Sequence, residues 1–182
     1  MLTPHLPLYA RARYFLRILE GVSVQLYHSL YSAIWSKRGT PQAQADWTDP
    51  EAWIPERLDG EESKLALRIW RESNGELNPR YLRGSWLYAN RHGLLEAGTN
   101  GKLTITDRGC AFLDGNPDLI AILDEAEGML ALLRLVVERG PAQRSTLLPG
   151  FTTFCHNFTT WRSESPIKLA LYSRLMNLMD RG

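Results

Sequence analysis

The sequence predicts a mainly α-helical protein built on a winged helix-turn-helix, with a small β-hairpin as the wing. Residues 77–93 read as a basic helical segment without an acidic residue. A Gly/Asn turn between two short apolar strands follows, and Thr106-Asp107 then opens another helix. Two helices joined by a short turn and followed by a hairpin are typical of domains that place a helix in duplex DNA.

Length and composition are those of an ordinary globular protein. The chain has 182 residues, of which 44% are hydrophobic and 23% charged, and its formal net charge is +1. This net charge does not point to a polyanionic partner, so a nucleic-acid interface has to come from local clusters of basic residues. Cys110 and Cys155 form no CxxC motif and the histidines are scattered, so we expect no disulfide framework, metal or cofactor.

The sequence also argues against a membrane protein or a secreted one. Arginines interrupt the apolar N-terminal stretch, and no uncharged apolar run approaches the ~18 residues that a membrane span needs. We expect a cytoplasmic protein with no membrane partner.

Helices are expected first over residues 5–20 and 22–36, where apolar side chains recur at helical spacing. Residues 39–60 contain three prolines and two glycines, which predicts mostly loop, with a short strand near residues 42–47. A further helix is expected over 61–73, because acidic residues at its start and arginines toward its end suit the helix dipole.

The predicted recognition helix covers residues 79–92, with Asn78 as its N-cap and Pro79 in its first position. Residues 94–97 and 102–106 are the expected strands of the wing, on either side of a turn at 98–101. A short capped helix then ends near Gly115.

Three further helical elements repeat the helical part of a winged helix. They are a long helix over 118–138, a helical region over 142–161 broken at Pro149-Gly150, and a helix over 165–179 with Pro166 in its first position. No hairpin follows them, so we predict a tandem winged helix whose second unit lacks its wing. The expected divisions are an N-terminal helical segment (1–45), a winged-helix domain (46–115) and a truncated second unit (116–182).

A helical wheel divides the predicted recognition helix into two faces. Leu82, Trp86 and Ala89 lie on the apolar face, and the opposite face is basic. Arginine can bind phosphate or guanine edges, tyrosine can reach phosphate, and glycine lets a backbone come close. The residues predicted to bind DNA here are Asn78, Arg80, Arg83, Gly84, Leu87, Tyr88 and Arg91, with Thr99, Asn100 and Lys102 at the tip of the wing.

The candidates in the second unit lie where the last helix starts, because its unbonded backbone N–H groups attract phosphate. They are Arg162, Ser163, Ser165 and Lys168. An ordinary helix cap with solvated surface charge is the alternative interpretation.

Trp47 and Trp53, on the predicted loop, are candidates for a pocket that stacks a modified or flipped base. The alternative for both tryptophans is packing in a core.

No catalytic site is expected. The sequence has no P-loop, GxSxG, HExxH or GxGxxG motif. Asp49, Glu62 and Lys64 have a spacing that resembles a metal-dependent nuclease, but Glu62 and Lys64 begin a predicted helix and do not lie on adjacent strands.

A dimerisation or protein-docking module is the alternative to DNA binding. Apolar residues of the last helix lie outside its packing stripe and need a cover. They are Leu169, Met176 and Met179.

The run RYLRGSWLYANRHGLLEAGTNGKLTITDRGCAFLDG resembles the winged-helix region that precedes the nuclease domain in Mrr-type (type IV, modification-dependent) restriction endonucleases. ERGPAQRSTLLPGF and SPIKLALYSRLMNLMDRG are similar to the second winged-helix unit of some of these proteins, so the resemblance covers roughly residues 47–182. It implies a bacterial defence protein in which this region recognises double-stranded DNA, including modified DNA. It also implies a PD-(D/E)xK nuclease domain C-terminal to this region. That core is lacking here, so we expect this chain to bind DNA and not to cut it.

Overall fold

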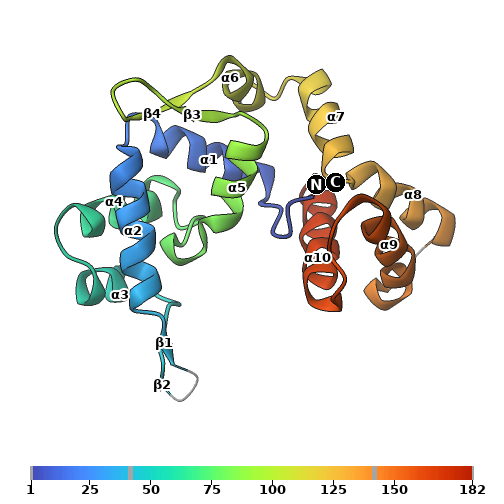
Figure 1. The fold of residues 1–182 in the computed structure, drawn as a ribbon, viewed down its shortest axis with the longest axis horizontal. Helices are drawn as coiled ribbons and strands as arrows, with labels where there is room; N and C mark the ends of the chain where they lie inside the picture. Colours follow the sequence, from blue (N-terminus) through green and yellow to red (C-terminus); the bar gives the residue numbers. More distant parts are fainter. Residues whose placement is uncertain (1, 41–42, 141–142, 182) are drawn as a thin grey trace. The chain divides into compact units, whose positions relative to one another are not determined.

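A computed structural model shows a mainly helical chain and describes residues 2–40, 43–140 and 143–181. The chain divides into two compact units (Figure 1). Residues 10–110 form the central unit, and residues 1–9 together with 111–182 form the terminal unit. These boundaries differ from the three segments drawn from the sequence, because residues 10–45 belong to the same unit as the predicted recognition helix and wing.

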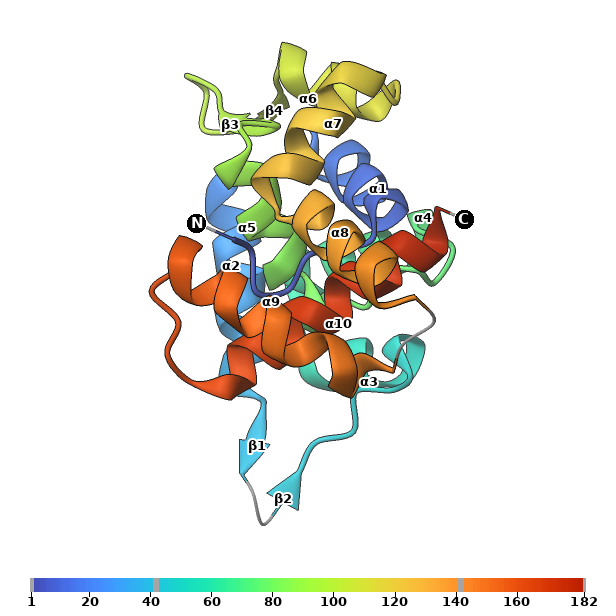
Figure 2. The same cartoon turned by 90° about the vertical axis from the view of Figure 1, so that its right-hand side faces the viewer.

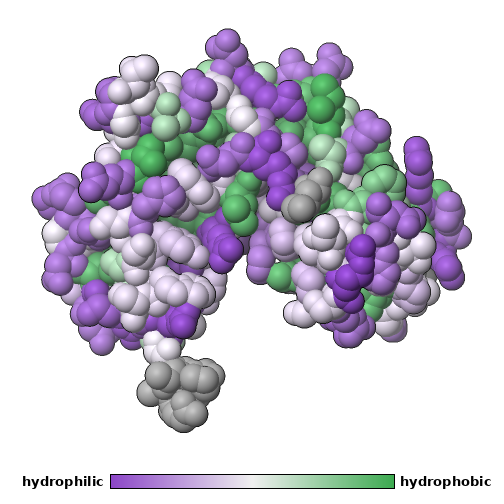
Figure 3. All heavy atoms as spheres, viewed as in Figure 1, coloured by the Kyte–Doolittle hydropathy of each residue, from purple (hydrophilic) through white to green (hydrophobic). Residues whose placement is uncertain are grey.

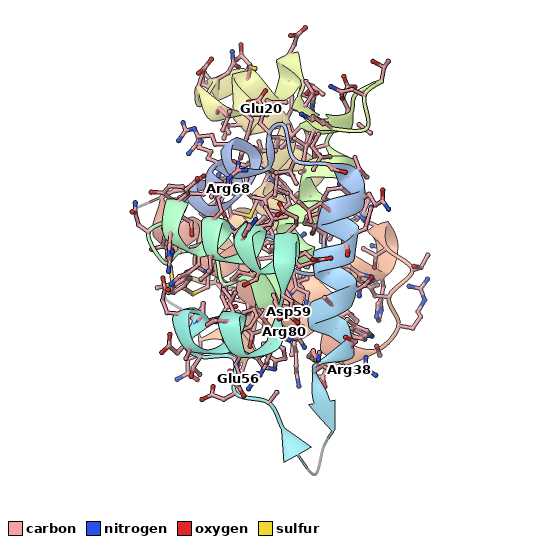
Figure 4. The ribbon with its side chains drawn as sticks, turned by 90° about the vertical axis from the view of Figure 1, so that its left-hand side faces the viewer. Glu20, Arg38, Glu56, Asp59, Arg68 and Arg80 are labelled. Atoms are coloured by element: carbon pink, nitrogen blue, oxygen red, sulfur yellow. The ribbon has the colours of Figure 1, made fainter. Side chains whose placement is uncertain are left out.

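The core of the central unit is formed by apolar faces of several helices. Its completely or almost completely buried side chains include Phe15, Leu16, Leu30 and Ile69. Arg68 donates a hydrogen bond to the carbonyl oxygen of Ile18, which ties one helix to another (Figure 4). In chain order the elements are α1 (Tyr9–Leu19), α2 (Val24–Ser36), β1 (Gly39–Thr40), β2 (Ala43–Gln44), α3 (Pro50–Arg57), α4 (Gly60–Glu72), the 3₁₀ helix η1 (Pro79–Tyr81), α5 (Arg83–Arg91), β3 (Leu95–Ala97), β4 (Leu103–Ile105) and α6 (Asp107–Leu113).

The predicted hairpin after the basic helix is confirmed as the antiparallel pair β3–β4, in which Glu96 lies opposite Thr104. A third segment extends this ladder. Leu103 N–H donates to the Val22 carbonyl and Gly21 N–H donates to the Leu103 carbonyl, both at 2.8 Å. The link between α1 and α2 therefore runs along the outer edge of β4.

The prediction of mostly loop over residues 39–60 is wrong, because α3 occupies residues 50–57. Asp49 is its N-cap and accepts a hydrogen bond from Glu51 N–H at 3.0 Å, and Pro50 stands in the first helical position. Burial of Trp53 and Ile54 then stabilises the short helix. Part of the predicted strand is β2, while Gln42 lies outside the described residues.

The basic segment forms two helical pieces where one was predicted. Asn78 does act as an N-cap, since its Oδ1 accepts from Arg80 N–H at 2.9 Å. The first turn is the 3₁₀ helix η1, and α5 begins after Leu82. A 3₁₀ turn has 3.0 residues where an α-helix has 3.6, so the directions of side chains before and after Leu82 do not follow one helical wheel.

The terminal unit has its own core between three helices (Figure 2). Leu132, Phe151, Cys155 and Leu171 are completely buried in it. Its helices are α7 (Pro117–Ala126), α8 (Met129–Arg139), α9 (Arg144–Phe158) and α10 (Glu164–Asp180).

Three predictions about these helices are wrong. The helix expected over 118–138 is divided into α7 and α8 at Gly128, whose φ of +72° is left-handed. The break expected at Pro149-Gly150 does not occur, because α9 continues through Pro149. Leu135 of α8 packs directly on Gly150, and this close packing favours a continuous α9. Pro166 is also the third residue of α10 and not its first.

A buried ion pair joins three segments of the terminal unit. Arg174 Nη2 lies 2.7 Å from Glu127 Oε2, and both side chains are completely buried. The Glu127 carboxylate accepts hydrogen bonds from the N–H and the hydroxyl of Thr3, and Arg174 Nη1 donates to the Thr3 carbonyl. The N-terminal segment is thereby fixed to α10 and to the junction of α7 and α8.

Among the helices that the structure describes, none is both long enough and apolar enough to cross a membrane.

Replacement of Arg174 by methionine should destabilise the terminal unit by ~3–5 kcal/mol, because Glu127 then stays buried without its cation. Denaturant unfolding followed by circular dichroism measures the change. Lys168→Met is the matched control, since Lys168 also pairs with a carboxylate on α10, but at the surface; it should change the free energy of unfolding by less than ~1 kcal/mol. Equal effects of the two substitutions would contradict this role of Arg174.

The two cysteines should differ sharply in reactivity. Burial raises the pKa of the Cys155 thiol to about 11, and the nearby Arg174 cation only partly opposes this. Because the thiolate is the nucleophile, Cys155 should stay unreactive toward a disulfide reagent at neutral pH and become reactive when the protein unfolds or the pH nears its pKa. Exposed Cys110 should react in the native protein. A Cys110→Ser variant that still reacts rapidly would show that Cys155 is accessible.

Candidate nucleic-acid interface

Helix α5 has a buried face and an exposed basic face. Ser85, Tyr88 and Ala89 are buried, whereas Arg83 and Arg91 are exposed. Leu87 is exposed between the two arginines, and Gly84 is half-buried beside them. Four of the predicted contact residues therefore share one side of α5, as the sequence predicts.

Arg80 does not belong to this exposed face. Its guanidinium lies over the ring of Trp47, 5.2 Å from the ring centroid, and the side chain is half-buried (Figure 4). Its Nε is buried and has no hydrogen-bond partner among the residues that the structure describes. Asn78 is also engaged locally, because its Nδ2 donates to the Trp47 carbonyl at 2.7 Å. Both residues hold the start of the basic segment against the loop before α3.

The prediction that Tyr88 reaches phosphate is wrong, because its side chain is completely buried. Its ring packs against that of His92, with the centroids 4.8 Å apart. The 3₁₀ turn of η1 explains the error for Arg80, since it shifts the residues before Leu82 relative to α5. Tyr88 lies on α5 itself, on the buried side with Ser85 and Ala89.

The proposed base pocket is not open in this structure. Trp47 and Trp53 are both buried and pack edge to face, with ring centroids 4.9 Å apart. Arg57 and Arg80 cover the Trp47 ring at 4.8 and 5.2 Å. Core packing, the alternative interpretation for these tryptophans, therefore describes both.

The tip of the β3–β4 hairpin is exposed. Thr99, Asn100 and Lys102 all lie at the surface, as predicted. The Asn100 side chain also stabilises the turn, because its Oδ1 accepts from Lys102 N–H at 3.0 Å.

The base of the hairpin is fixed by α6. Thr106 Oγ1 donates to the Gly93 carbonyl at 2.6 Å and accepts from Gly109 N–H at 3.0 Å, which confirms the predicted helix cap. A Cβ on Gly109 would lie only 2.1 Å from the Leu94 carbonyl oxygen, so α6 approaches the start of β3 as closely as a glycine allows.

An aromatic cluster beside α5 was not among the predicted contacts. The ring of half-buried Trp86 stacks on Tyr27 of α2 at 4.2 Å, and exposed His28 meets the Trp86 ring edge-on. Burial raises the pKa of the Tyr27 hydroxyl, with a smaller contribution from Tyr31. Because α2 and α5 are far apart in the sequence, no local pattern could place His28 near α5.

The candidates in the terminal unit surround the start of α10. Ser163 is the N-cap without a side-chain cap bond, and Ser165 is exposed. Arg162 Nη1 donates to the Thr159 and Trp161 carbonyls, so part of its guanidinium serves the preceding turn. Lys168 pairs with Glu164 at 2.9 Å, and this carboxylate reduces the attraction of the helix start for phosphate.

No group of three or more His, Cys, Asp or Glu side chains within the described ranges is arranged to hold a metal ion. Comparisons with protein-family models, with curated proteins and with solved structures found no match to this chain.

Replacement of Gly109 by alanine should destabilise the central unit by ~1–3 kcal/mol, because the new methyl group would collide with backbone at the base of the hairpin. Thermal unfolding followed by circular dichroism tests this. Cys110→Ala, at the exposed neighbouring position, is the control and should leave the unfolding temperature almost unchanged. A fully stable Gly109→Ala protein would mean that α6 does not pack tightly on β3.

Proposed function

We infer that the central unit is a winged-helix domain that binds double-stranded DNA, with α5 as its recognition helix and the β3–β4 hairpin as its wing. The order of its elements supports this: α4, a turn, η1 with α5, and an antiparallel hairpin follow one another in the chain. Residues 21–24 add a third segment to the ladder at the edge of β4.

The exposed basic face of α5 is the observation that carries this inference. Arg83, Leu87 and Arg91 recur at four-residue intervals on the exposed side, so one helix face can meet a groove of duplex DNA. Arg83 forms no ion pair with any residue within the described ranges, which leaves its guanidinium available to phosphate or to a guanine edge. Neither η1 nor α5 contains an acidic residue.

The proposed contact surface is smaller than the sequence predicts. It keeps Arg83, Gly84, Leu87 and Arg91 of α5 and leaves out Asn78, Arg80 and Tyr88, whose side chains pack internally. At the hairpin it keeps Thr99, Asn100 and Lys102.

DNA binding by the terminal unit has less support than DNA binding by the central unit. Its described residues contain helices and no strand, so support for a second winged helix comes from the sequence repeat alone. Glu164 beside Lys168 also weakens the case for phosphate binding at the start of α10.

The resemblance to Mrr-type restriction endonucleases supports a further proposal, that DNA binding here serves a defence enzyme of the cytoplasm. Recognition of a modified base would need an open pocket with stacking faces. The buried Trp47–Trp53 pair does not provide one, so in this proposal the base edges in the groove are read from α5.

Binding to a duplex should weaken steeply as the salt concentration rises, because each arginine or lysine on a phosphate releases counterions. Arg83→Ala should lower the salt slope by about 1 if Arg83 binds phosphate, or weaken binding by ~1–3 kcal/mol at selected sequences if it binds a base. Fluorescence anisotropy of a labelled duplex at several salt concentrations measures both quantities.

Arg71→Ala is the matched control for this experiment. Arg71 lies on α4 of the same unit and is exposed, but its Nη2 already pairs with Glu51 at 2.7 Å. The control should bind DNA as wild type does. Absence of binding at low salt, or an equal loss in both variants, would overturn the proposal.

A further inference from the structure

Helix α8 of the terminal unit exposes an apolar stripe that no described residue covers. Leu130, Leu133 and Val137 are 41%, 44% and 74% exposed, although Met129 and Leu132 on the other side are buried. Their spacing of three and then four residues places them along one side of the helix. Such a row is the seam by which one helix packs against another.

More apolar surface adjoins one end of this stripe. Leu130 and Phe158 of α9 line a cavity of about 310 Å³ that Arg134 also borders. Phe158 is itself strongly exposed. In Figure 3 hydrophobic surface is visible over α7 and part of α8. Contiguous exposed apolar surface of this kind marks interaction sites in soluble proteins.

Two charges of opposite sign flank the stripe. Arg134 and Glu138 are exposed on the same flank of α8, four residues apart. On α10 the pair at the same spacing, Glu164 and Lys168, forms an ion pair, but within the described residues none joins Arg134 to Glu138. Both charged groups are therefore available to a partner. A second copy of the chain would offer a carboxylate for Arg134 and a guanidinium for Glu138.

We propose that α8 is a self-association surface, on which α8 of a second copy of this chain packs in antiparallel orientation about a two-fold axis. When Leu133 lies opposite Val137 of the second copy, Arg134 lies about two residues, or ~3 Å along the axis, from the level of Glu138 of the second copy. The two-fold symmetry forms this ion pair twice. A parallel two-fold arrangement would place Arg134 and Glu138 of the two copies on opposite sides of the contact, where neither could pair with the other, so the charge pattern selects the antiparallel one.

Because a single helix from each copy forms the proposed contact, we expect it to bury less than the ~1,000 Å² of a stable interface, so the dimer should be weak and depend on concentration. This inference does not rest on DNA binding, because all of its residues lie in the terminal unit.

Analytical ultracentrifugation of the full chain over about a hundredfold range of concentration tests the proposal. The weight-average mass should rise from the monomer value of 20.7 kDa toward twice that value. Val137→Glu should remain monomeric throughout. Met179→Glu is the matched control, because Met179 is also 74% exposed but lies on α10, and it should dimerise as wild type does.

A charge-reversal cycle tests the orientation. Arg134→Glu and Glu138→Arg should each weaken dimerisation by ~tenfold, since each places like charges together, and the double variant Arg134→Glu/Glu138→Arg should restore it. These exposed substitutions also decide the matter if Val137→Glu fails to fold.

Three results would overturn the proposal. They are a mass that stays at the monomer value over the whole range, a loss of dimer in Met179→Glu but not in Val137→Glu, and a double variant that is no better than its single variants. The second result would place the contact on α10 instead.

Discussion

The backbone ladder at the edge of β4 is the interaction on which the central unit depends. Leu103 exchanges two hydrogen bonds with residues 21 and 22, and Val24 N–H donates to the Gly101 carbonyl. Because residues 21–24 connect α1 to α2, these bonds join the N-terminal helices to the hairpin. Thr106 and Gly109 fix its base from α6. The hairpin, which follows α5 in the chain, is thus held along one edge and at its base, while its tip stays exposed.

The terminal unit depends on a different interaction, the buried pair of Arg174 and Glu127. An ion pair can be buried without a large loss of stability only when most of its hydrogen bonds are satisfied. Here Thr3 donates two hydrogen bonds to the Glu127 carboxylate and accepts one from Arg174. This requirement explains why the N-terminal segment belongs to the same unit as α10. It also gives the junction at Gly128 a role, since Glu127 directly before it supplies both its carboxylate and its carbonyl to Arg174. The separate helix α8 that follows carries the exposed stripe.

Much of the candidate site could be predicted because its signals are local. The Asn78 cap, the β3–β4 hairpin and the Thr106 cap each depend on residues within a few positions of one another, and all three occur. The errors have equally specific causes. A single 3₁₀ turn changed the direction of Arg80 relative to one regular helix, whereas Tyr88 lies on the side of α5 that packs into the core. The cap at Asp49 converted a predicted loop into α3, which buried Trp53.

The sequence by itself determined where most helices and the hairpin form, because capping, turn residues and apolar periodicity act over short stretches of chain. Only the tertiary structure decided which segments meet. Residues 21–24 became a third member of the ladder, the segment before α1 packed on α10, and α9 stayed helical through Pro149. Each of these outcomes depends on contacts between residues that are distant in sequence. Their free energy comes from burial and hydrogen bonding in the assembled core, which no local pattern contains.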